Sequence, residues 1–255
     1  MTTIYDTQSL LVRYLTKLLR NPILFGTSLV EPLIFLVIFS QLFQKLSAFL
    51  PNVSGGYLAY LLPGIVIMSA FITSPQSGVS IVNDLNSGFL SVMLLSQVRR
   101  PAILLGRLLT DMLVVVLQCT VTILAGIAMG VKVYYGLPGV LLILLTAAFL
   151  EFALSGIFLA VGIATRKTET VNALTGFLGF LLMFVSSALL PTSFLPSWAQ
   201  AFSSFNPLSY TADAMRELVL GGFELSALLD AYIFTGAIAV ATLAATLYQF
   251  RKVIT

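Results

Sequence analysis

Long apolar runs are the feature that most constrains the fold of this chain. An α-helix needs about 20 mostly apolar residues to cross the roughly 30 Å hydrocarbon core of a bilayer. Six segments meet this requirement: residues 23–43, 57–79, 103–128, 137–163, 171–190 and 228–250. Of the 255 residues, 58% are hydrophobic and 9% are charged, whereas soluble domains are about 25% charged. So little polar surface cannot face water, and we predict an all-α integral membrane protein.

Nothing in the chain indicates a second domain or a catalytic centre. The longest gap between apolar runs, residues 191–227, is itself largely apolar, so residues 1–255 are predicted to be a single transmembrane domain. No glycine-rich phosphate loop ends in Lys-Ser or Lys-Thr, and the chain has no histidine. We therefore expect no nucleotide-binding domain, no metal or cofactor site and no enzyme activity in this chain. Basic clusters with interleaved aromatic residues are absent, so nucleic acid is not an expected partner.

The positions of lysine and arginine predict the orientation, because cytoplasmic loops carry an excess of both. With the N-terminus inside, ten cationic residues fall in inward segments: Arg13, Lys17, Arg20, Arg99, Arg100, Arg107, Arg166, Lys167, Arg251 and Lys252. Three fall outside: Lys45, Lys132 and Arg216. We therefore predict a multi-pass protein of the cell membrane with six spans and both termini in the cytoplasm.

Residues 4–20 precede the first apolar run and are amphipathic. Leu11, Tyr14, Leu15 and Leu18 fall on one helical face. The opposite face carries Arg13, Lys17 and Arg20. This pattern predicts a helix lying on the membrane surface. It is expected to end at Asn21-Pro22, because proline disfavours the α conformation in the residue before it.

The apolar segment 191–222 is broken by Pro191, Pro196 and Pro207 and closed by two glycines. Irregular backbone at membrane depth is tolerated only where protein groups or water in a cavity form hydrogen bonds with its N–H and C=O groups. We predict two short helices, at about 196–204 and 207–220, that dip into the outer leaflet or lie on it. Trp198 and Tyr210 suit the membrane interface.

The predicted cytoplasmic loop 84–100 contains apolar residues. Its centre, Gly88 to Ser96, is predicted to form a short helix with Phe89, Val92 and Met93 on one face. Such a helix would give a soluble partner a point of attachment. The alternative is an ordinary positive-inside loop whose apolar residues pack beneath the helices.

Among the acidic residues of the predicted spans, the candidates for a functional role are Glu31, Asp111 and Glu151. A charge at membrane depth is costly and usually faces protein or water. Each is therefore a candidate for substrate contact, proton binding or a polar contact between helices. The alternative is that each pairs with a polar neighbour, and Arg107 is placed for Asp111 at i, i+4.

Four groups of residues resemble the permease subunits of type-2 ATP-binding-cassette exporters, particularly the daunorubicin-resistance-like multidrug permeases. They are Arg20-Asn21-Pro22; the run YLAYLLPG at 57–64; Asp84 to Gly88 with Arg99-Arg100 and Leu104-Leu105-Gly106-Arg107; and Leu195 to Trp198 with Asn206-Pro207-Leu208 and Ala214-Met215-Arg216. Together they extend over nearly the whole chain.

The resemblance implies six spans, an amphipathic connecting helix, a coupling helix after span two and a re-entrant element before span six. The connecting helix would carry Arg13, Lys17 and Arg20. The ATPase-coupling residues would be Asp84, Gly88, Phe89, Val92, Met93, Leu94, Arg99 and Arg100. The re-entrant element would include Pro196, Trp198, Asn206, Pro207 and Arg216. Relatives often place charged residues where this chain has Asn86, Ser87 and Ser91, so contact with the ATPase would rest more on Phe89, Met93 and Leu94.

The resemblance also implies partners and an activity. Two copies of a cytoplasmic ATPase subunit would bind ATP and Mg²⁺, and a second permease subunit, identical or homologous, would complete the assembly among membrane lipids. The chain would then export an amphipathic drug, lipid or glycolipid by alternating access. Three alternatives remain: a polysaccharide exporter, a self-sufficient ion-coupled secondary transporter using Glu31 or Glu151, and a membrane scaffold without transport.

Overall fold

The computed structural model describes residues 2–45, 56–95, 100–222 and 224–252, and all regular elements within them are helices. The α-helices are α1 (Thr2–Leu19), α2 (Pro22–Leu42), α3 (Gly56–Thr73), α4 (Pro75–Asn86), α5 (Phe89–Leu95), α6 (Arg100–Ala128), α7 (Gly136–Thr165), α8 (Thr168–Phe184), α9 (Ser197–Ser203), α10 (Pro207–Leu220) and α11 (Leu225–Lys252). A short 3₁₀ helix, η2, covers Thr192–Phe194. The predicted all-α class is confirmed for these residues.

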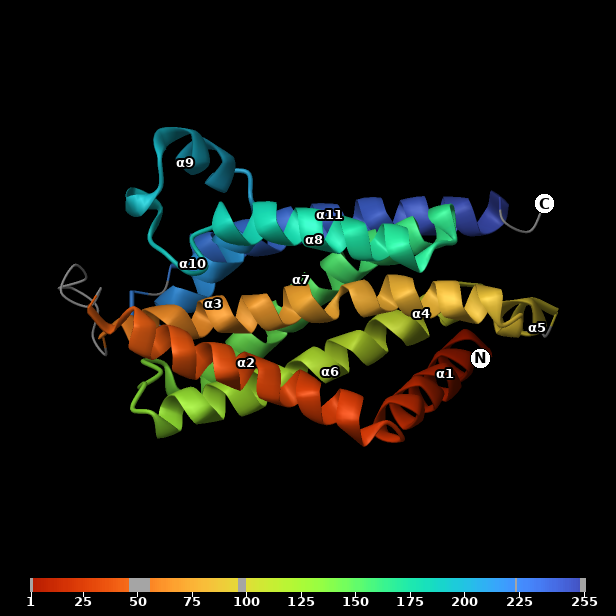
Figure 1. The fold of residues 1–255 in the computed structure, drawn as a ribbon, viewed down its shortest axis with the longest axis horizontal. Helices are drawn as coiled ribbons and strands as arrows, with labels where there is room; N and C mark the ends of the chain where they lie inside the picture. Colours follow the sequence, from red (N-terminus) through yellow and green to blue (C-terminus); the bar gives the residue numbers. More distant parts are fainter. Residues whose placement is uncertain (1, 46–55, 96–99, 223, 253–255) are drawn as a thin grey trace.

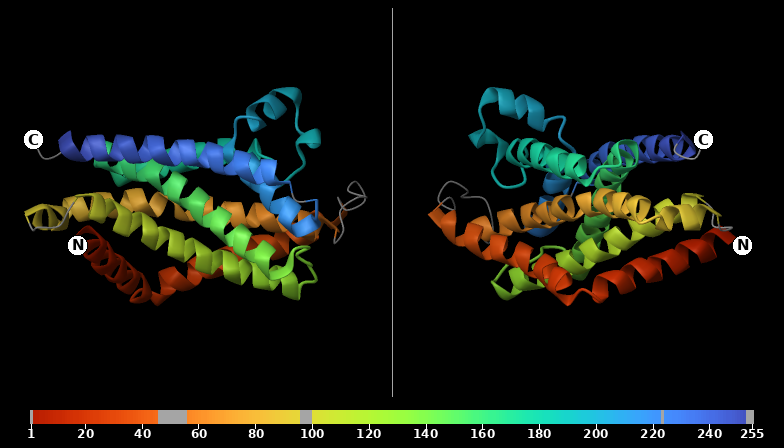
Figure 2. Two further views of the ribbon diagram at one scale, coloured as in Figure 1. Left: turned by 180° about the vertical axis from the view of Figure 1, so that it is seen from behind. Right: turned by 45° about the vertical axis from the view of Figure 1, so that its right-hand side comes forward.

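The long helices form one elongated bundle, with α3 and α4 running end to end along it (Figure 1). The start of α1, the short helix α5 and the end of α11 lie at one end of the bundle, which we call the α5 end (Figures 1 and 2). Helix α9 lies at the opposite end, which we call the α9 end (Figure 1). Both termini thus lie at the same end, as the predicted topology requires. That this end faces the cytoplasm stays a prediction.

Among the described residues, five helical segments are long and apolar enough to cross a membrane: residues 25–42, 56–86, 101–128, 136–165 and 225–249. The sixth predicted span, 171–190, contains a helix of 17 residues, α8, that stops at Phe184. The predicted count of six spans is therefore not confirmed by helix length. The physical reason is a run of turn and irregular backbone over residues 185–191.

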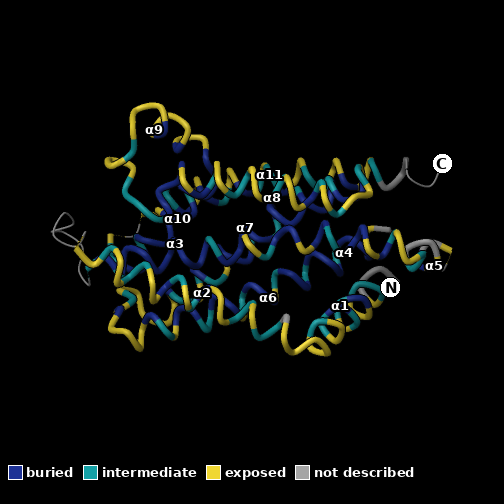
Figure 3. The backbone as a smooth tube through the Cα atoms, in the orientation of Figure 1, coloured by how far each residue is buried: buried dark blue, intermediate teal, exposed yellow. Residues whose placement is uncertain are grey.

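Helix α3 lies at the centre of the apolar core. Its side chains Leu61, Leu62 and Ile65 are fully buried in the main core cluster, and the ring of Phe71 meets that of Phe158 in α7 edge-on, with 6.2 Å between the ring centroids. A second core cluster at the α5 end joins Leu10 and other residues of α1 to α4, α5, α6 and α7. By contrast, most of α2 and α11 is not buried within the chain, and the tube in Figure 3 is dark along α3 and α7 and lighter on the outer elements. Apolar side chains on these outer helices suit contact with lipid or with another subunit.

The predicted second span, 57–79, proves to be a longer helix with a break. Pro75 lacks the N–H that would bond the carbonyl of Phe71, and the hydroxyl of Ser74 donates to that carbonyl instead, at 2.9 Å. Helix α4 then continues to Asn86, so the helix extends beyond the predicted end at residue 79. The prediction that residues 84–86 begin a loop is wrong, because they are helical. The predicted helix was too short because it is followed by residue types that favour turns, namely Asn83, Asp84 and Asn86.

The other predicted short helices are confirmed as helices. Residues 4–20 correspond to α1, 88–96 to α5, 196–204 to α9 and 207–220 to α10. Gly88 has a φ of +72° and separates α4 from α5, a conformation that glycine adopts without steric cost. The placement of α1, α9 and α10 relative to a membrane surface stays a prediction.

Arg216 of α10 supports the irregular segment that follows α8. Its Nη2 donates to the carbonyl oxygens of Ser187 and, at 2.9 Å, of Ala188. Its Nε donates to the carbonyl oxygen of Tyr60 at 3.3 Å, and the guanidinium lies 3.7 Å from the centroid of the Tyr60 ring. Asp213 Oδ1 forms an ion pair with Arg216 Nη1 at 2.8 Å. One buried cation therefore connects α10, α3 and the irregular segment that follows α8.

We expect Arg216→Lys to lower the free energy of unfolding by about 2 kcal/mol or more, because a lysine cannot reach three carbonyl oxygens as the guanidinium fork does. The matched control is Asp213→Asn, since the Asp213 side chain is 56% exposed and exposed ion pairs contribute about 1 kcal/mol or less. Thermal and denaturant unfolding of the detergent-solubilised protein measures both. Equal losses of unfolding free energy in the two variants would contradict the conclusion that Arg216 supports the segment after α8.

The same irregular segment packs directly on α3 at Gly64. A methyl group added at Gly64 would overlap the carbonyl oxygen of Ala188. Gly26 of α2, in contrast, has no neighbouring atom within 4 Å of such a group.

We expect Gly64→Ala to destabilise the protein by about 1–3 kcal/mol, the usual cost of overpacking. Gly26→Ala should be neutral or slightly stabilising, because alanine has the higher helix propensity. Unfolding measurements on both variants in one detergent test this. A neutral Gly64→Ala would show that residues 185–190 move away from α3 easily.

Candidate functional site

Helix α5 is attached to the bundle on one side and exposed on the other. Met93 is 5% exposed and packs into the second core cluster. The Phe89 ring lies 3.4 Å from the guanidinium carbon of Arg13, a cation–π contact with α1. Val92 and Leu95 are 64% and 90% exposed. Of the predicted face, Met93 is thus buried and Val92 exposed. Among the α5 side chains that the structure describes, Val92 and Leu95 are the apolar ones open to a partner.

Several predicted coupling residues cannot be placed. Arg99 lies outside the described residues, and the side chains of Leu94 and Arg100 lie outside them as well. In α1, the side chains of Lys17 and Arg20 are exposed. Their role in contacting an ATPase stays a prediction.

Asp84 is buried at the junction of α4 with α1. Its Oδ2 accepts a hydrogen bond of 3.2 Å from the hydroxyl of Tyr14, and both residues are nearly inaccessible. Burial and the negative charge of Asp84 raise the pKa of Tyr14 to about 12, although Arg107 and Arg13 oppose the shift. Tyr14 therefore keeps its proton at physiological pH and remains the donor. A coupling role for Asp84 would act through this junction and not by surface contact.

Asp111 is paired as predicted. Arg107 Nη2 lies 3.0 Å from Asp111 Oδ1, four residues along α6, and both side chains are buried. The same Nη2 donates to the carbonyl oxygen of Gln76 at 3.1 Å, and the hydroxyl of Ser77 donates to Asp111 Oδ2. The pair therefore connects α6 to the first turn of α4.

Glu151 of α7 is fully buried behind the break between α3 and α4. The hydroxyl of Ser155 donates to Glu151 Oε1 at 2.6 Å and lies 3.4 Å from the carbonyl oxygen of Ser74. Its other oxygen, Oε2, has no hydrogen-bond partner among the described residues. Glu151 is thus a polar contact within the core and does not line the cavity described next.

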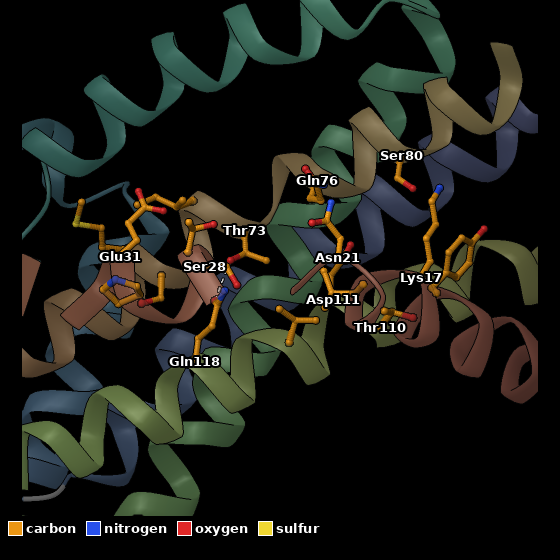
Figure 4. Close-up of a pocket in the computed structure, with 18 of the residues that line it drawn as sticks. Lys17, Asn21, Ser28, Glu31, Thr73, Gln76, Ser80, Thr110, Asp111 and Gln118 are labelled. Atoms are coloured by element: carbon orange, nitrogen blue, oxygen red, sulfur yellow. Dashed lines mark hydrogen bonds between the residues drawn. The ribbon is translucent and has the colours of Figure 1, made fainter. Parts of the chain in front are cut away.

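A cavity of about 340 Å³ lies between the end of α1, helix α2, the α3–α4 helix and α6 (Figure 4). Its apolar lining comes from Leu18, Pro32, Phe35, Ile65, Met68, Ile72 and Val114. Its polar lining includes Lys17, Asn21, Thr27, Ser28, Glu31, Thr73, Gln76, Ser80, Asn83, Thr110, Asp111 and Gln118. Thr73 donates to Gln118 Oε1 at 2.9 Å, within this lining. A mixed site of this size is typical of those that bind drug-sized molecules.

Glu31 lines this cavity from α2 and is exposed. It is the tenth of the 21 residues in α2, so it lies about 14 Å from the start of the helix. No ion pair to Glu31 is present among the described residues. Of the three acidic candidates, the structure therefore brings Glu31 and Asp111 to one cavity and places Glu151 elsewhere.

The sequence model described as ABC-2 type transporter matches residues 5–220, from the first turn of α1 to the end of α10. The chain belongs to this family. The resemblance to type-2 ATP-binding-cassette permeases is thereby confirmed.

Three curated relatives of the chain are named as permeases. The daunorubicin resistance ABC transporter permease protein DrrB1 of Streptomyces coeruleorubidus is 30% identical over 190 residues, 74% of this chain and 66% of that protein. The putative transport permease ycf38 of Cyanophora paradoxa is 31% identical over 227 residues, 86% and 76% of the two chains. The probable doxorubicin resistance ABC transporter permease protein DrrC of Mycobacterium tuberculosis is 25% identical over 228 residues, 89% and 82% of the two. These relatives indicate that this member of the ABC-2 family is a transport subunit that lies in a membrane.

Sequence reasoning missed several residues of this ABC-2 permease site. Tyr14 was assigned only to an apolar face, although its hydroxyl bonds Asp84. Ser77 and Gln118 carried no signal, because single serine and glutamine residues are common in spans. The Arg216–Asp213 pair was detectable from its i, i+3 spacing.

We expect Tyr14→Phe to lower the free energy of unfolding by about 1–3 kcal/mol, because it leaves the buried carboxyl of Asp84 without its hydroxyl donor. Tyr5→Phe on the same helix is the matched control, since Tyr5 is 75% exposed. Unfolding in detergent measures both. Similar stabilities for the two variants would contradict a structural role for this bond.

Proposed function

We propose that this chain is the permease subunit of an ATP-driven exporter that moves an amphipathic drug, lipid or glycolipid by alternating access. ATP and Mg²⁺ would bind to two copies of a separate ATPase subunit, and a second permease subunit, identical or homologous, would complete the assembly. The family membership supports the class of transporter. The observation that carries the proposal for this chain is the connection from α5 to the cavity.

The connection begins at the exposed side of α5. Val92 and Leu95 offer an apolar contact at the α5 end, beside α1, while Met93 and Phe89 anchor the helix to the bundle. A force on α5 would pass through Gly88 into α4. The Tyr14–Asp84 bond would carry α1 with it.

Helix α4 forms one wall of the cavity. Gln76, Ser80 and Asn83 line the cavity from α4, and Arg107 and Ser77 connect α4 to α6. The break at Ser74-Pro75 provides a position at which α4 would tilt relative to α3. To change the ratio of inward-open to outward-open states from about 1:99 to 99:1, ATP binding must favour one state by roughly 5.5 kcal/mol.

The proposed topology places the α5 end in the cytoplasm, with both termini there. Helix α8 would serve as the fifth crossing, completed by residues 185–190, and α11 as the sixth. A helix of 17 residues is at the lower limit for crossing a bilayer. Helices α9 and α10 would form the re-entrant element at the outer surface.

A second candidate function is ion-coupled transport without an ATPase. The observation that favours it is the buried carboxyl of Glu151, whose Oε2 has no hydrogen-bond partner among the described residues. Transport by the purified chain in liposomes, driven by a proton or sodium gradient alone, would establish it and overturn the ATP-driven proposal.

The test of the ATP-driven proposal is capture of the tagged chain from its native host, followed by assay of the copurified ATPase. We expect an ATPase whose hydrolysis depends on the chain. Leu95→Asp should reduce its association by about tenfold or more, because it places a charge where an apolar side chain is to be buried. Leu95 is preferable to Phe89 for this test, since an aspartate at 89 would lie beside Arg13 and form an ion pair.

The matched control is Leu95→Met, which keeps an apolar side chain of similar size and should retain association and coupling. Unchanged association in Leu95→Asp would exclude the exposed side of α5 as the contact. Capture of no ATPase from the host would contradict the proposed function itself.

A further inference from the structure

The lining of the cavity beside α2 has an apolar part and a polar part. Ile65, Met68 and Ile72 of α3 form an apolar wall, with Phe35 of α2 one turn beyond Glu31. Thr27 and Ser28, one turn before Glu31, are polar. A molecule that fits this cavity would place an apolar body against α3 and Phe35 and a polar group at Glu31.

Glu31 is a carboxylate without a counter-charge. It lies near the middle of α2, a helix long enough to cross the bilayer, and no cation pairs with it among the described residues. A charged side chain at this depth usually faces protein, water or an ion pathway, and marks a functional site. Because Glu31 is exposed and lines the cavity, its carboxylate is accessible to a bound molecule.

The other charges around the cavity are accounted for. Arg107 and Asp111 neutralise each other at 3.0 Å. Lys17 lies at the opposite end of the cavity from Glu31 (Figure 4), on the exposed face of α1. The only unpaired charge in the deep part of the described cavity lining is therefore negative.

We infer that this cavity binds amphipathic cations, with the Glu31 carboxylate as the counter-ion and the Phe35 ring and the α3 wall as the apolar contacts. The inference deepens the proposed export function and rests on it for the view that the bound molecule is transported. Anionic lipids and free anions are disfavoured, because they would bring a second negative charge beside Glu31. The electron-rich face of Phe35 adds to the preference for a cation.

The test uses two probes of nearly the same size and shape and of opposite charge: the tetraphenylphosphonium cation and the tetraphenylborate anion. Binding of each to the purified chain in neutral-lipid nanodiscs is measured by calorimetry or equilibrium dialysis. Empty nanodiscs give the background of partition into lipid. We expect the wild-type protein to bind the cation at least about tenfold more tightly than the anion, the preference that a charge-assisted contact supports.

Variants test the assignment to Glu31. Glu31→Gln should lower the affinity for tetraphenylphosphonium by about tenfold or more, and Glu31→Asp should retain part of it. Asp230→Asn is the matched control, because Asp230 is an exposed carboxylate on another apolar helix, α11, away from the cavity. Size-exclusion chromatography of each variant checks that it is folded and that its oligomeric state is unchanged.

Each outcome decides the question. Equal binding of the two probes, a preference for the anion, or unchanged cation binding in Glu31→Gln would overturn the inference. If Glu31→Gln fails to fold or changes only the oligomeric state, the inference is judged from the wild-type protein alone. It then depends on whether that protein binds tetraphenylphosphonium more tightly than tetraphenylborate. The binding assay contains no ATPase, so its failure leaves the ATPase capture experiment intact. Conversely, cation binding through Glu31 in a chain that activates no ATPase would refute the export function alone.

Discussion

A helix that is interrupted within an apolar surrounding leaves carbonyl groups with no water to bond. This chain has interruptions at Pro75 and after Phe184, and each is satisfied by a specific side chain. The hydroxyl of Ser74 bonds the Phe71 carbonyl that Pro75 cannot reach, and the guanidinium of Arg216 bonds the carbonyls of Ser187 and Ala188. Both side chains are buried, but the Ser74 bond is local whereas Arg216 comes from α10. They keep these carbonyl groups bonded where α3 ends at Thr73 and where α8 stops at Phe184.

Buried charge follows the same logic. Arg107 and Arg216 each lie beside a carboxylate and also donate to backbone carbonyls of a neighbouring helix. These contacts offset the free-energy cost of removing each arginine from water. Each arginine also connects elements that are far apart in the sequence. Glu31 departs from this pattern, because it is charged, near mid-helix and unpaired among the described residues. Glu151 and Asp230 also lack an ion pair among the described residues, but Glu151 lies in the core and Asp230 away from the cavity, whereas Glu31 faces the cavity. An unpaired charge at a cavity is where function is to be expected.

Much of the fold was predictable from the sequence, because apolar runs and proline positions act locally. Helix α10 has the predicted bounds, α9 differs from prediction by one residue at each end, and α5 begins one residue later than predicted. The Arg107–Asp111 pair was predictable because its spacing places both residues on one face of a helix. Helix α8 was predicted too long, since apolar composition does not reveal that distant groups such as Arg216 will satisfy the carbonyls of Ser187 and Ala188. The burial of Asp84 could not be predicted either, because it depends on Tyr14, 70 residues away.

The packing of α4 indicates which parts of the permease would move together. Gly78 of α4 lies directly against the backbone of Phe158 in α7, and a methyl group added at Gly162 would lie 2.7 Å from the carbonyl oxygen of Gly78. Backbone contacts this close resist sliding, so α4 and α7 would move as one body. Helix α2, on the other side of the cavity, is mostly not buried and packs on α3 and α6. Under the proposed mechanism, a force on α5 would therefore change the cavity mainly by moving the α4 wall relative to α2, which carries Glu31.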